Sequence, residues 1–132
     1  LLESYSARKN LELLASIRGV ASAQDSTRSL ERVGLDPHDR RHVRKYSLGM
    51  KQRAGIAMAL MEAPDLLVLD EPTNALDEGA RAELAQIISE ERGRGAAVLL
   101  SSHDSEFLRA TCDVIYHMEL GRVTSREEIG YE

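Results

Sequence analysis

The sequence predicts an α/β fold in which a helical first half precedes part of a parallel sheet. In 1–64 the apolar residues recur at helical spacing, as Leu11, Leu14 and Ile17 do on one expected helix face. In 65–132, three short apolar runs alternate with two helical stretches. The order strand–helix–strand–helix–strand is typical of parallel strands joined by right-handed crossovers. We therefore divide the chain between these two ranges.

The helices of the first half are bounded by residues that start and stop helices. Ser6 and Ser47 are expected to cap helix N-termini, because a serine hydroxyl accepts a hydrogen bond from the free backbone N–H groups there. Gly19 and Gly34 end helices, since glycine adopts the left-handed conformation at low cost, and Pro64 stops the longest one. The expected segments are helices over 7–18, 26–35 and 48–63, and a turn or short helix that starts at 36–37.

The second half contains the expected strands. The run "LLVLD" is short and continuously apolar, which is typical of a strand covered on both faces in a parallel sheet. Asp77 is expected to cap the helix that follows, and Gly121 turns the chain after the third strand into "RVTS". We expect strands over 66–70, 96–101 and 113–119, a helix that starts at 78 and ends at Gly93 or Gly95, and a helix over 105–111.

The composition is that of a globular protein. The 132 residues are 42% hydrophobic and 30% charged, and their formal net charge of -5 gives no support for nucleic-acid binding. The basic run "RRHVRK" over 40–45 is short, and we interpret it as a solvated helix face or a subunit contact. A single cysteine, Cys112, excludes an internal disulfide. No apolar stretch approaches the roughly 20 residues that a membrane-spanning helix needs.

Polar residues directly follow two of the expected strands. Asp70 and Glu71 end the first strand, and His103 follows the second. Ligands of open parallel sheets bind beyond the carboxyl ends of the strands. A carboxylate at that edge can hold a hydrated Mg²⁺, and a second one can orient or deprotonate a water. A histidine one strand away can contact a terminal phosphate.

An anion site is predicted at the start of the long helix. Ser47 and the backbone around Gly49 present a hydroxyl and free N–H groups, and the helix dipole adds partial positive charge there. Phosphate is the expected anion. Taken singly, the serine is explained as a cap, "LDEP" as a strand end with a turn, and His103 as a satisfied polar residue. Together, and in this order, these features are far more specific.

With these motifs the chain resembles one family. The block "YSLGMKQRAGIAMALMEAPDLLVLDEPTNALD" resembles the signature helix, Walker B strand and D-loop of an ABC-transporter ATPase, and "SSHD" resembles its H-switch. The resemblance extends over about residues 6 to 125. It implies a partial P-loop NTPase domain. The helical subdomain with the signature helix is 1–64, and the C-terminal part of a RecA-like nucleotide-binding core is 65–132.

The signature itself departs from the family's common Leu-Ser-Gly-Gly-Gln pattern. Ser47 and Gly49 match it and are implied to contact the nucleotide, whereas Tyr46, Leu48 and Met50 differ. This variant resembles the branch that exports bacitracin, lantibiotics and similar drugs.

The resemblance also implies roles for individual polar residues. Asp70 corresponds to the Walker B aspartate on the magnesium side, and Glu71 to the catalytic glutamate. His103 corresponds to the catalytic switch histidine, and Asp77 is the D-loop aspartate at the nucleotide. Glu3 either stands at the family's Gln-loop position or is a surface glutamate.

The phosphate loop, G-x-x-x-x-G-K-[ST], is missing from the 132 residues. Its lysine precedes Ser or Thr, whereas Asn10, Tyr46 and Gln52 follow the three lysines of this chain. In the family this loop precedes the helical segment, so we expect it upstream of Leu1. The chain then resembles a little over half of an ATPase domain, with an uncovered sheet edge that is expected to associate.

Three hypotheses follow. In the first, the parent protein binds and hydrolyses ATP with Mg²⁺ and powers a membrane exporter from the cytoplasmic face of the cell membrane. Its implied partners are transmembrane permease subunits and a second ATPase subunit in a head-to-tail dimer, with no nucleic acid. The alternative is a soluble ABC-type ATPase that acts on DNA or ribosomes. The third hypothesis is that this chain by itself is a structural fragment without catalysis.

Overall fold

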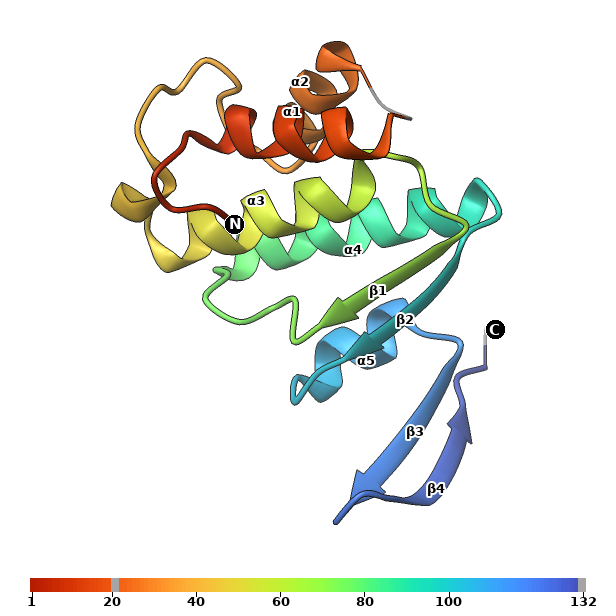
Figure 1. The fold of residues 1–132 in the computed structure, drawn as a ribbon. Coiled ribbons are helices and arrows are strands. Elements are labelled where there is room, and N and C mark those ends of the chain that lie inside the picture. The colour runs from red at the N-terminus through yellow and green to blue at the C-terminus, as the bar shows by residue number, and fades with distance from the viewer. Residues whose placement is uncertain (20–21, 131–132) are drawn as a thin grey trace.

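The computed structural model describes residues 1–19 and 22–130 and contains helices followed by two small sheets (Figure 1). The helical part comprises α1 (Ala7–Arg18), α2 (Ala23–Arg32), the 3-10 helix η1 (Val43–Lys45) and α3 (Leu48–Leu60). The remaining elements are β1 (Leu66–Asp70), α4 (Glu78–Gly93), β2 (Ala97–Ser101), α5 (Ser105–Thr111), β3 (Val114–Glu119) and β4 (Arg122–Glu128).

The capping residues act as the sequence predicts. Ser6 Oγ accepts a hydrogen bond from the Lys9 backbone N–H at the start of α1, and Ser47 Oγ accepts one from Met50 at the start of α3. Gly19 ends α1 with a φ of 68°, in the left-handed region that glycine adopts easily. Each helix therefore begins at the residue that follows its capping serine.

Two helix predictions need correction. The second helix begins at Ala23 rather than at residue 26, because Ser22 and Asp25 form a reciprocal capping box that starts it earlier. The third helix ends at Leu60, three residues before the expected end. Ile17, placed on the apolar face of α1, is 82% exposed. Because a helix has about 3.6 residues per turn, a residue six positions after Leu11 lies off the face that Leu11 occupies.

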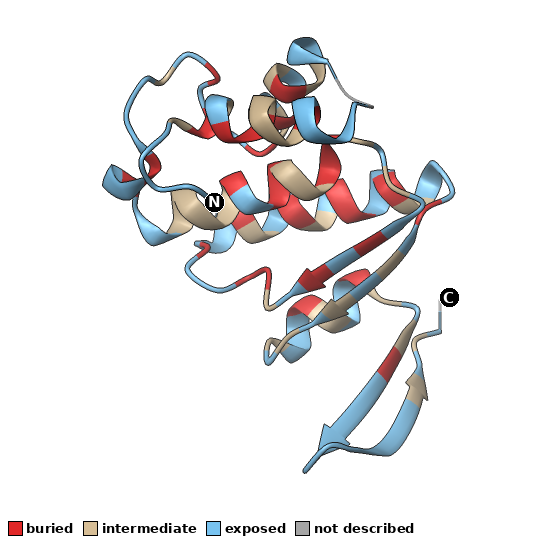
Figure 2. Ribbon diagram, in the orientation of Figure 1, coloured by how far each residue is buried: buried red, intermediate tan, exposed pale blue. Residues whose placement is uncertain are grey.

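The first two strands pair in parallel, as predicted. β1 and β2 lie in register from Leu66 opposite Ala97 to Asp70 opposite Ser101, and α4 makes the crossover between them. Leu67 and Leu69 are buried on the face beneath α3 and α4. The expectation that both faces are covered is wrong for this chain, because Val68 is 58% exposed on the other face (Figure 2).

The third strand does not join this sheet. β3 pairs antiparallel with β4, a strand that the sequence analysis did not predict, and no ladder joins β3 to β1 or β2 within 1–19 and 22–130. Leu120 and Gly121, with φ of 49° and 75°, form a tight turn between β3 and β4. A two-residue turn with positive φ returns the chain directly along the preceding strand, which imposes antiparallel pairing.

A single hydrophobic cluster extends through both halves of the chain. It contains the apolar faces of α1, α2, α3 and α4 together with Leu67 and Leu69 of β1 and Phe107 of α5. The division between 1–64 and 65–132 stays a prediction, since α3 packs against α2 on one side and β1 on the other. In the part of the chain that the structure describes, no helix has the length and apolarity that crossing a bilayer requires.

A buried carboxylate fastens the helical half to α4. Glu91 on α4 is 3% exposed. Its Oε1 lies 2.5 Å from Arg32 Nη1 on α2, and its Oε2 lies 2.5 Å from Arg94 Nη2. Arg32 also pairs with the exposed Glu90 at 2.8 Å, and Arg94 donates to the Pro64 carbonyl at 2.6 Å. Glu91 therefore ties α2 to the end of α4, and Arg94 joins the same end to Pro64.

We expect Glu91→Gln to destabilise the full-length protein at neutral pH by about 3 kcal/mol, because it removes the counter-charge of Arg94 and one of the two carboxylates that pair with Arg32. Burial raises the pKa of Glu91, but hydrogen bonds from Arg32 and Arg94 outweigh burial and lower it below its usual value. Because the pKa of Glu91 is lower in the folded state, its ionised carboxylate stabilises the fold fully at pH values above the pKa of the unfolded chain. This stabilisation disappears as the pH falls through the pKa of the folded state.

Thermal unfolding measured from pH 7 downward tests this prediction. The difference between wild type and variant should be largest at neutral pH and should shrink below about pH 4.5, the usual glutamate range. Glu90→Gln is the matched control, and it should lower the unfolding midpoint much less than Glu91→Gln does, because the Glu90 carboxylate is exposed. A difference that persists unchanged at acid pH would contradict an ionic origin.

Candidate functional site

The carboxyl ends of β1 and β2 bring the predicted polar residues together. Asp70 is the last residue of β1 and lies opposite Ser101, the last residue of β2. Ser101 Oγ donates a hydrogen bond to Asp70 Oδ1 at 2.5 Å. The Glu71 backbone N–H donates to the Ser101 carbonyl at 3.0 Å, which extends the strand pairing by one step. Parallel register therefore fixes the position of both carboxylates.

Glu71 is held in an uncommon backbone conformation. Its φ is 49°, in the left-handed region that few residues other than glycine, asparagine and aspartate adopt. Its carboxylate Oε1 lies 3.3 Å from His103 Nε2. The His103 side chain is 98% exposed, whereas that of Glu71 is 26% exposed. A water or phosphate at this edge can therefore reach both groups.

The start of α3 forms a second group of predicted residues. Ser47, Gly49 and Asp77 line a cleft of about 480 Å³ between α3 and the turn that precedes α4. Asp77 Oδ1 accepts a hydrogen bond from the Ala80 N–H at 2.8 Å and caps α4 as predicted. Ser47 is exposed at the rim, and its hydroxyl accepts the capping hydrogen bond from the Met50 N–H at 3.1 Å.

Gly49 is required by a close backbone approach across this cleft. A Cβ built at Gly49 would lie 2.8 Å from the Ala75 carbonyl oxygen, a distance that side chains essentially never show. Ala75 itself has a φ of 62° in the turn before α4. The absence of a side chain at Gly49 therefore lets α3 and this turn touch.

Glu3 lies in neither group. Its carboxylate pairs with Lys51 Nζ at 2.8 Å, and the Arg44 N–H donates to its carbonyl at 3.1 Å. The hydrogen bond from Lys51 lowers the pKa of this exposed carboxyl, and the charge of Lys51 adds to the effect. Glu3 is thus exposed and bound to α3, and its place in a Gln-loop stays a prediction.

Sequence reasoning missed two residues that complete the strand-end group. Ser101 anchors Asp70, and Gln52 on α3 donates from Nε2 to the Glu71 carbonyl at 3.3 Å. Aligning the two strand ends would have placed Ser101 opposite Asp70. No signal in the sequence indicates the contact of Gln52, because it depends on how α3 packs beside β1.

The oxygen ligands at Asp70 suit a magnesium ion, but these residues could supply only some of the ligands that the ion needs. In the described ranges, no group of three or more His, Cys, Asp or Glu residues surrounds a metal position. One strand-end carboxylate with a neighbouring serine hydroxyl suits Mg²⁺, which takes one or two carboxylates and completes its octahedron with water and phosphate oxygens.

Comparison with known proteins decides the family. A family model described as "ABC transporter" matches residues 1–74, which is more than half of the chain. The chain belongs to the ABC transporter family. The resemblance predicted from the signature, Walker B, D-loop and H-switch motifs is therefore confirmed.

Relatives of this ABC transporter chain include several ATP-binding proteins. The uncharacterized ABC transporter ATP-binding protein YybJ of Bacillus subtilis is 43% identical over 100% of the chain and 61% of that protein. The lantibiotic transport ATP-binding protein SrtF of Streptococcus pyogenes is 38% identical over 97% of the chain and 56% of that protein. The bacitracin transport ATP-binding protein BcrA of Enterococcus faecalis is 39% identical over 92% of the chain and 40% of that protein.

The fold of this ABC transporter chain matches solved cassettes. A dimeric structure of the ATP-binding cassette MJ0796, in a post-hydrolysis state bound to ADP and Pi, superposes with a TM-score of 0.88. The two are 25% identical, and the match covers 100% of this chain and 60% of that one. The predicted fold class, part of a P-loop NTPase cassette, is confirmed. The chain spans about 40 to 60% of the length of the relatives it matches.

Proposed function

We propose that this ABC transporter chain is part of an ATP-binding subunit that hydrolyses ATP to power a membrane exporter. The observation that supports this most directly is the group at the ends of β1 and β2. There Asp70 is anchored by Ser101, and Glu71 faces His103 at 3.3 Å. A metal-binding carboxylate, a water-orienting carboxylate and a phosphate-contacting histidine are the parts that hydrolysis of a terminal phosphate requires.

Each residue has one task in this proposal. Asp70 holds Mg²⁺, which neutralises charge on the phosphates when it is bound. Glu71 accepts a hydrogen bond from the attacking water and aligns it with the terminal phosphate. His103 donates from its ring to an oxygen of that phosphate, and its contact with Glu71 keeps the two side chains on the same side of the edge.

The second group serves a different nucleotide. Ser47, Gly49 and Asp77 line one cleft, and neither Asp70 nor Glu71 lines it. Two separate groups are what a head-to-tail pair of ATPase subunits needs, because each subunit then contributes its α3 cleft to the nucleotide of the other. A dimeric cassette among the structural relatives supports this pairing. The division into a helical subdomain and a nucleotide-binding core belongs to the same proposal.

Export is the proposed direction, and the membrane is the proposed location. The names of SrtF and BcrA assign them to transport of a lantibiotic and of bacitracin. The Tyr46–Met50 signature, which differs from the common pattern, was the sequence feature that favoured this branch. ATP hydrolysis at the cytoplasmic face of the membrane would then drive conformational change in the permease subunits.

We propose further that the 132 residues by themselves do not turn over ATP. They contain no G-x-x-x-x-G-K-[ST] loop to cradle the phosphates. Calorimetry with Mg-ATP tests this directly, and micromolar binding by the isolated chain would contradict it.

Purification from the native membrane tests the proposed function. The full-length protein is expected to co-purify with a polytopic membrane protein and to hydrolyse ATP in that complex. Co-purification with ribosomes or DNA, with no membrane partner, would instead favour a soluble ABC-type ATPase and would overturn the proposal.

A further inference from the structure

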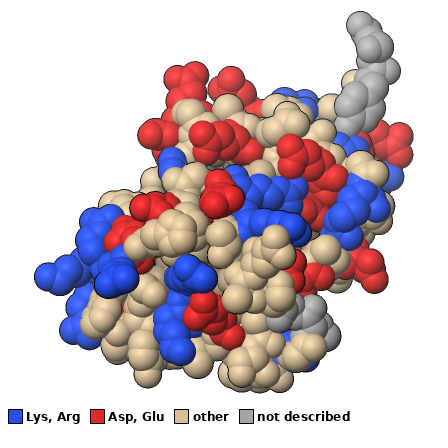
Figure 3. Space-filling model, turned by 90° about the horizontal axis from the view of Figure 1, so that it is seen from above, with Lys and Arg blue, Asp and Glu red and all other residues tan. Residues whose placement is uncertain are grey.

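Basic side chains gather at one end of the helical half. We define the basic strip as Arg8 and Lys9 on α1, Arg40 and Arg41 in the loop that precedes η1, and Arg44 and Lys45 on η1. The chain as a whole has a net charge of -5, so this strip is a local reversal of sign. In Figure 3, Lys and Arg side chains crowd the left part of the face seen from above, on the side where Figure 1 draws this loop.

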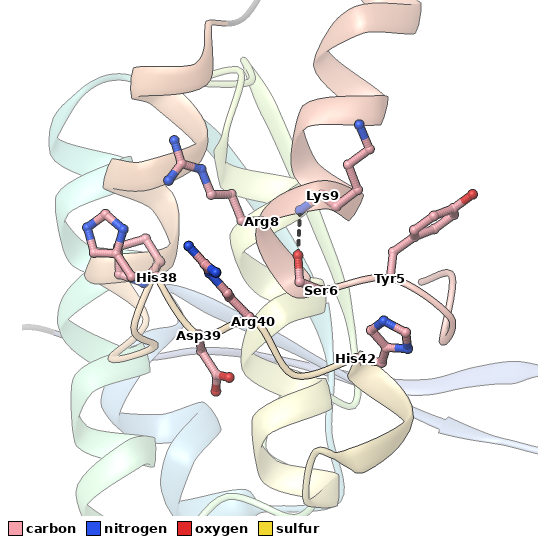
Figure 4. Close-up of a pocket in the computed structure, with 9 residues that line it drawn as sticks. Tyr5, Ser6, Arg8, Lys9, His38, Asp39, Arg40 and His42 are labelled. Atoms are coloured by element: carbon pink, nitrogen blue, oxygen red, sulfur yellow. Dashed lines mark hydrogen bonds between the residues drawn. The ribbon is translucent and has the colours of Figure 1, made fainter.

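The strip surrounds an open pocket of about 480 Å³. Arg8, Lys9 and Arg40 line it together with His38 and His42. Figure 4 shows Arg40 extending toward the start of α1, where Ser6 and Arg8 lie. The pocket therefore lies between the first turn of α1 and the loop before η1.

The positive charge of the pocket is only partly neutralised. Asp39 is the one acidic residue among those that line it, but its carboxylate pairs with Arg41 at 2.8 Å and points away from Arg40 (Figure 4). Arg8 pairs with Glu12 through Nε alone, at 2.9 Å. Lys9 and Arg40 make no ion pair with any residue of the described ranges.

The surface beyond the pocket has the same character. Arg44 and Lys45 are exposed and make no ion pair in the parts of the chain that the structure describes. Tyr5 lines the pocket, and its side chain is 45% exposed beside these cations. An aromatic ring with a polar tip beside several cations is a combination found where proteins meet the headgroup region of a membrane.

The backbone that presents the strip is fixed. The Val43 N–H donates to the Tyr5 carbonyl at 2.8 Å, and the Arg44 N–H donates to the Glu3 carbonyl at 3.1 Å. The Arg41 guanidinium lies over the Tyr46 ring, 5.5 Å from its centroid. These contacts fasten η1 to the segment before α1, so the backbone that carries these cations is ordered before binding.

We propose that the basic strip binds the anionic headgroups of membrane lipids. The cations are spread over three elements and an open surface, which suits a plane of many anions better than one enclosed ligand. The inference rests on the proposed function for one premise, which is that the protein lies at a membrane. The strip would give the chain a direct lipid contact that is independent of any permease.

Vesicle co-sedimentation of the full-length protein tests the proposal. We expect binding to phosphatidylcholine vesicles that contain phosphatidylglycerol, no binding to phosphatidylcholine alone, and loss of binding as salt rises. Replacing Lys9 and Arg40 with Gln should weaken partitioning roughly 25-fold, the effect of two cations at about fivefold each. Replacing Arg44 and Lys45 with Gln is a second, independent variant with the same expected loss.

The matched control removes the same charge elsewhere. Arg28 and Arg122 are exposed and outside the strip, and replacing both with Gln should leave binding within about twofold of wild type. An equal loss of vesicle binding in the control would indicate that binding depends on net charge alone, and it would overturn the proposal. Displacement by millimolar inorganic phosphate would assign the pocket to a free phosphate group instead. Binding of a polyglutamate peptide without vesicle binding would assign it to an acidic protein segment.

This experiment separates the inference from the proposed function. ATP hydrolysis by the same full-length variants is measured without vesicles, and none of the six strip residues belongs to the strand-end group. Normal hydrolysis with no lipid binding overturns only the lipid contact. Lipid binding without hydrolysis overturns only the proposed ATPase function.

Discussion

Replacing Glu71 with Gln in the full-length protein is expected to reduce steady-state ATP hydrolysis at least about 100-fold and to leave ATP binding intact. Gln is nearly the same size, so the 3.3 Å contact with His103 and the backbone bond to Ser101 can persist. It has no carboxylate to orient or deprotonate the attacking water. Turnover should therefore fail at the chemical step.

Glu119→Gln is the matched control for this experiment. Glu119 lies exposed at the end of β3, far along the chain from the strand-end group, and its replacement should leave the rate within about twofold of wild type. Nucleotide binding is measured by calorimetry beside the rate. Undiminished hydrolysis by the Glu71 variant would remove Glu71 from the proposed mechanism, whereas loss of binding as well would indicate a structural role.

Gly49→Ala is the second substitution with a large expected effect. The new Cβ would meet the Ala75 carbonyl oxygen at 2.8 Å, so either the start of α3 or the turn before α4 has to move. Overpacking of this kind costs about 1–3 kcal/mol. A displacement of the cleft by a fraction of an ångström to 1 Å is expected to lower ATP turnover by about 100-fold.

Gly55→Ala on the same helix is the control. Gly55 is exposed, and nothing lies within 4 Å of an added Cβ there. Alanine is a better helix former than glycine, so this variant should be more stable by about 0.5–1 kcal/mol. Unfolding midpoints and hydrolysis rates of both variants distinguish a local clash from a general effect of alanine in α3. A Gly49 variant that is stable and active would contradict the close approach.

Local chemistry in the sequence determined much of this protein. Serine caps at Ser6 and Ser47, the aspartate cap at Asp77 and the left-handed Gly19 fixed where α1, α3 and α4 begin and where α1 ends. These signals depend on a few neighbouring backbone groups, so they can be recognised from the sequence without a structure. The order of the motifs also predicted the family, which the comparison confirmed.

Tertiary structure decided which residues meet. The contact of Gly49 with Ala75, the bond from Gln52 to Glu71 and the pairing of Glu3 with Lys51 all join segments that no local pattern relates. Each depends on the position of α3 against another segment, and that position results from the packing of the whole apolar cluster.

The strands show the same division. Apolar runs predicted β1, β2 and β3, but a run of apolar residues does not specify its partner. The tight turn at Leu120 and Gly121 gave β3 a neighbour immediately along the chain, and antiparallel pairing with β4 followed. The sequence by itself therefore determined most of the elements, several of their caps and the family. Only the fold determined the partner of β3, the contacts within the two site groups and the gathering of the basic strip, because these arise from distances between residues far apart in the chain.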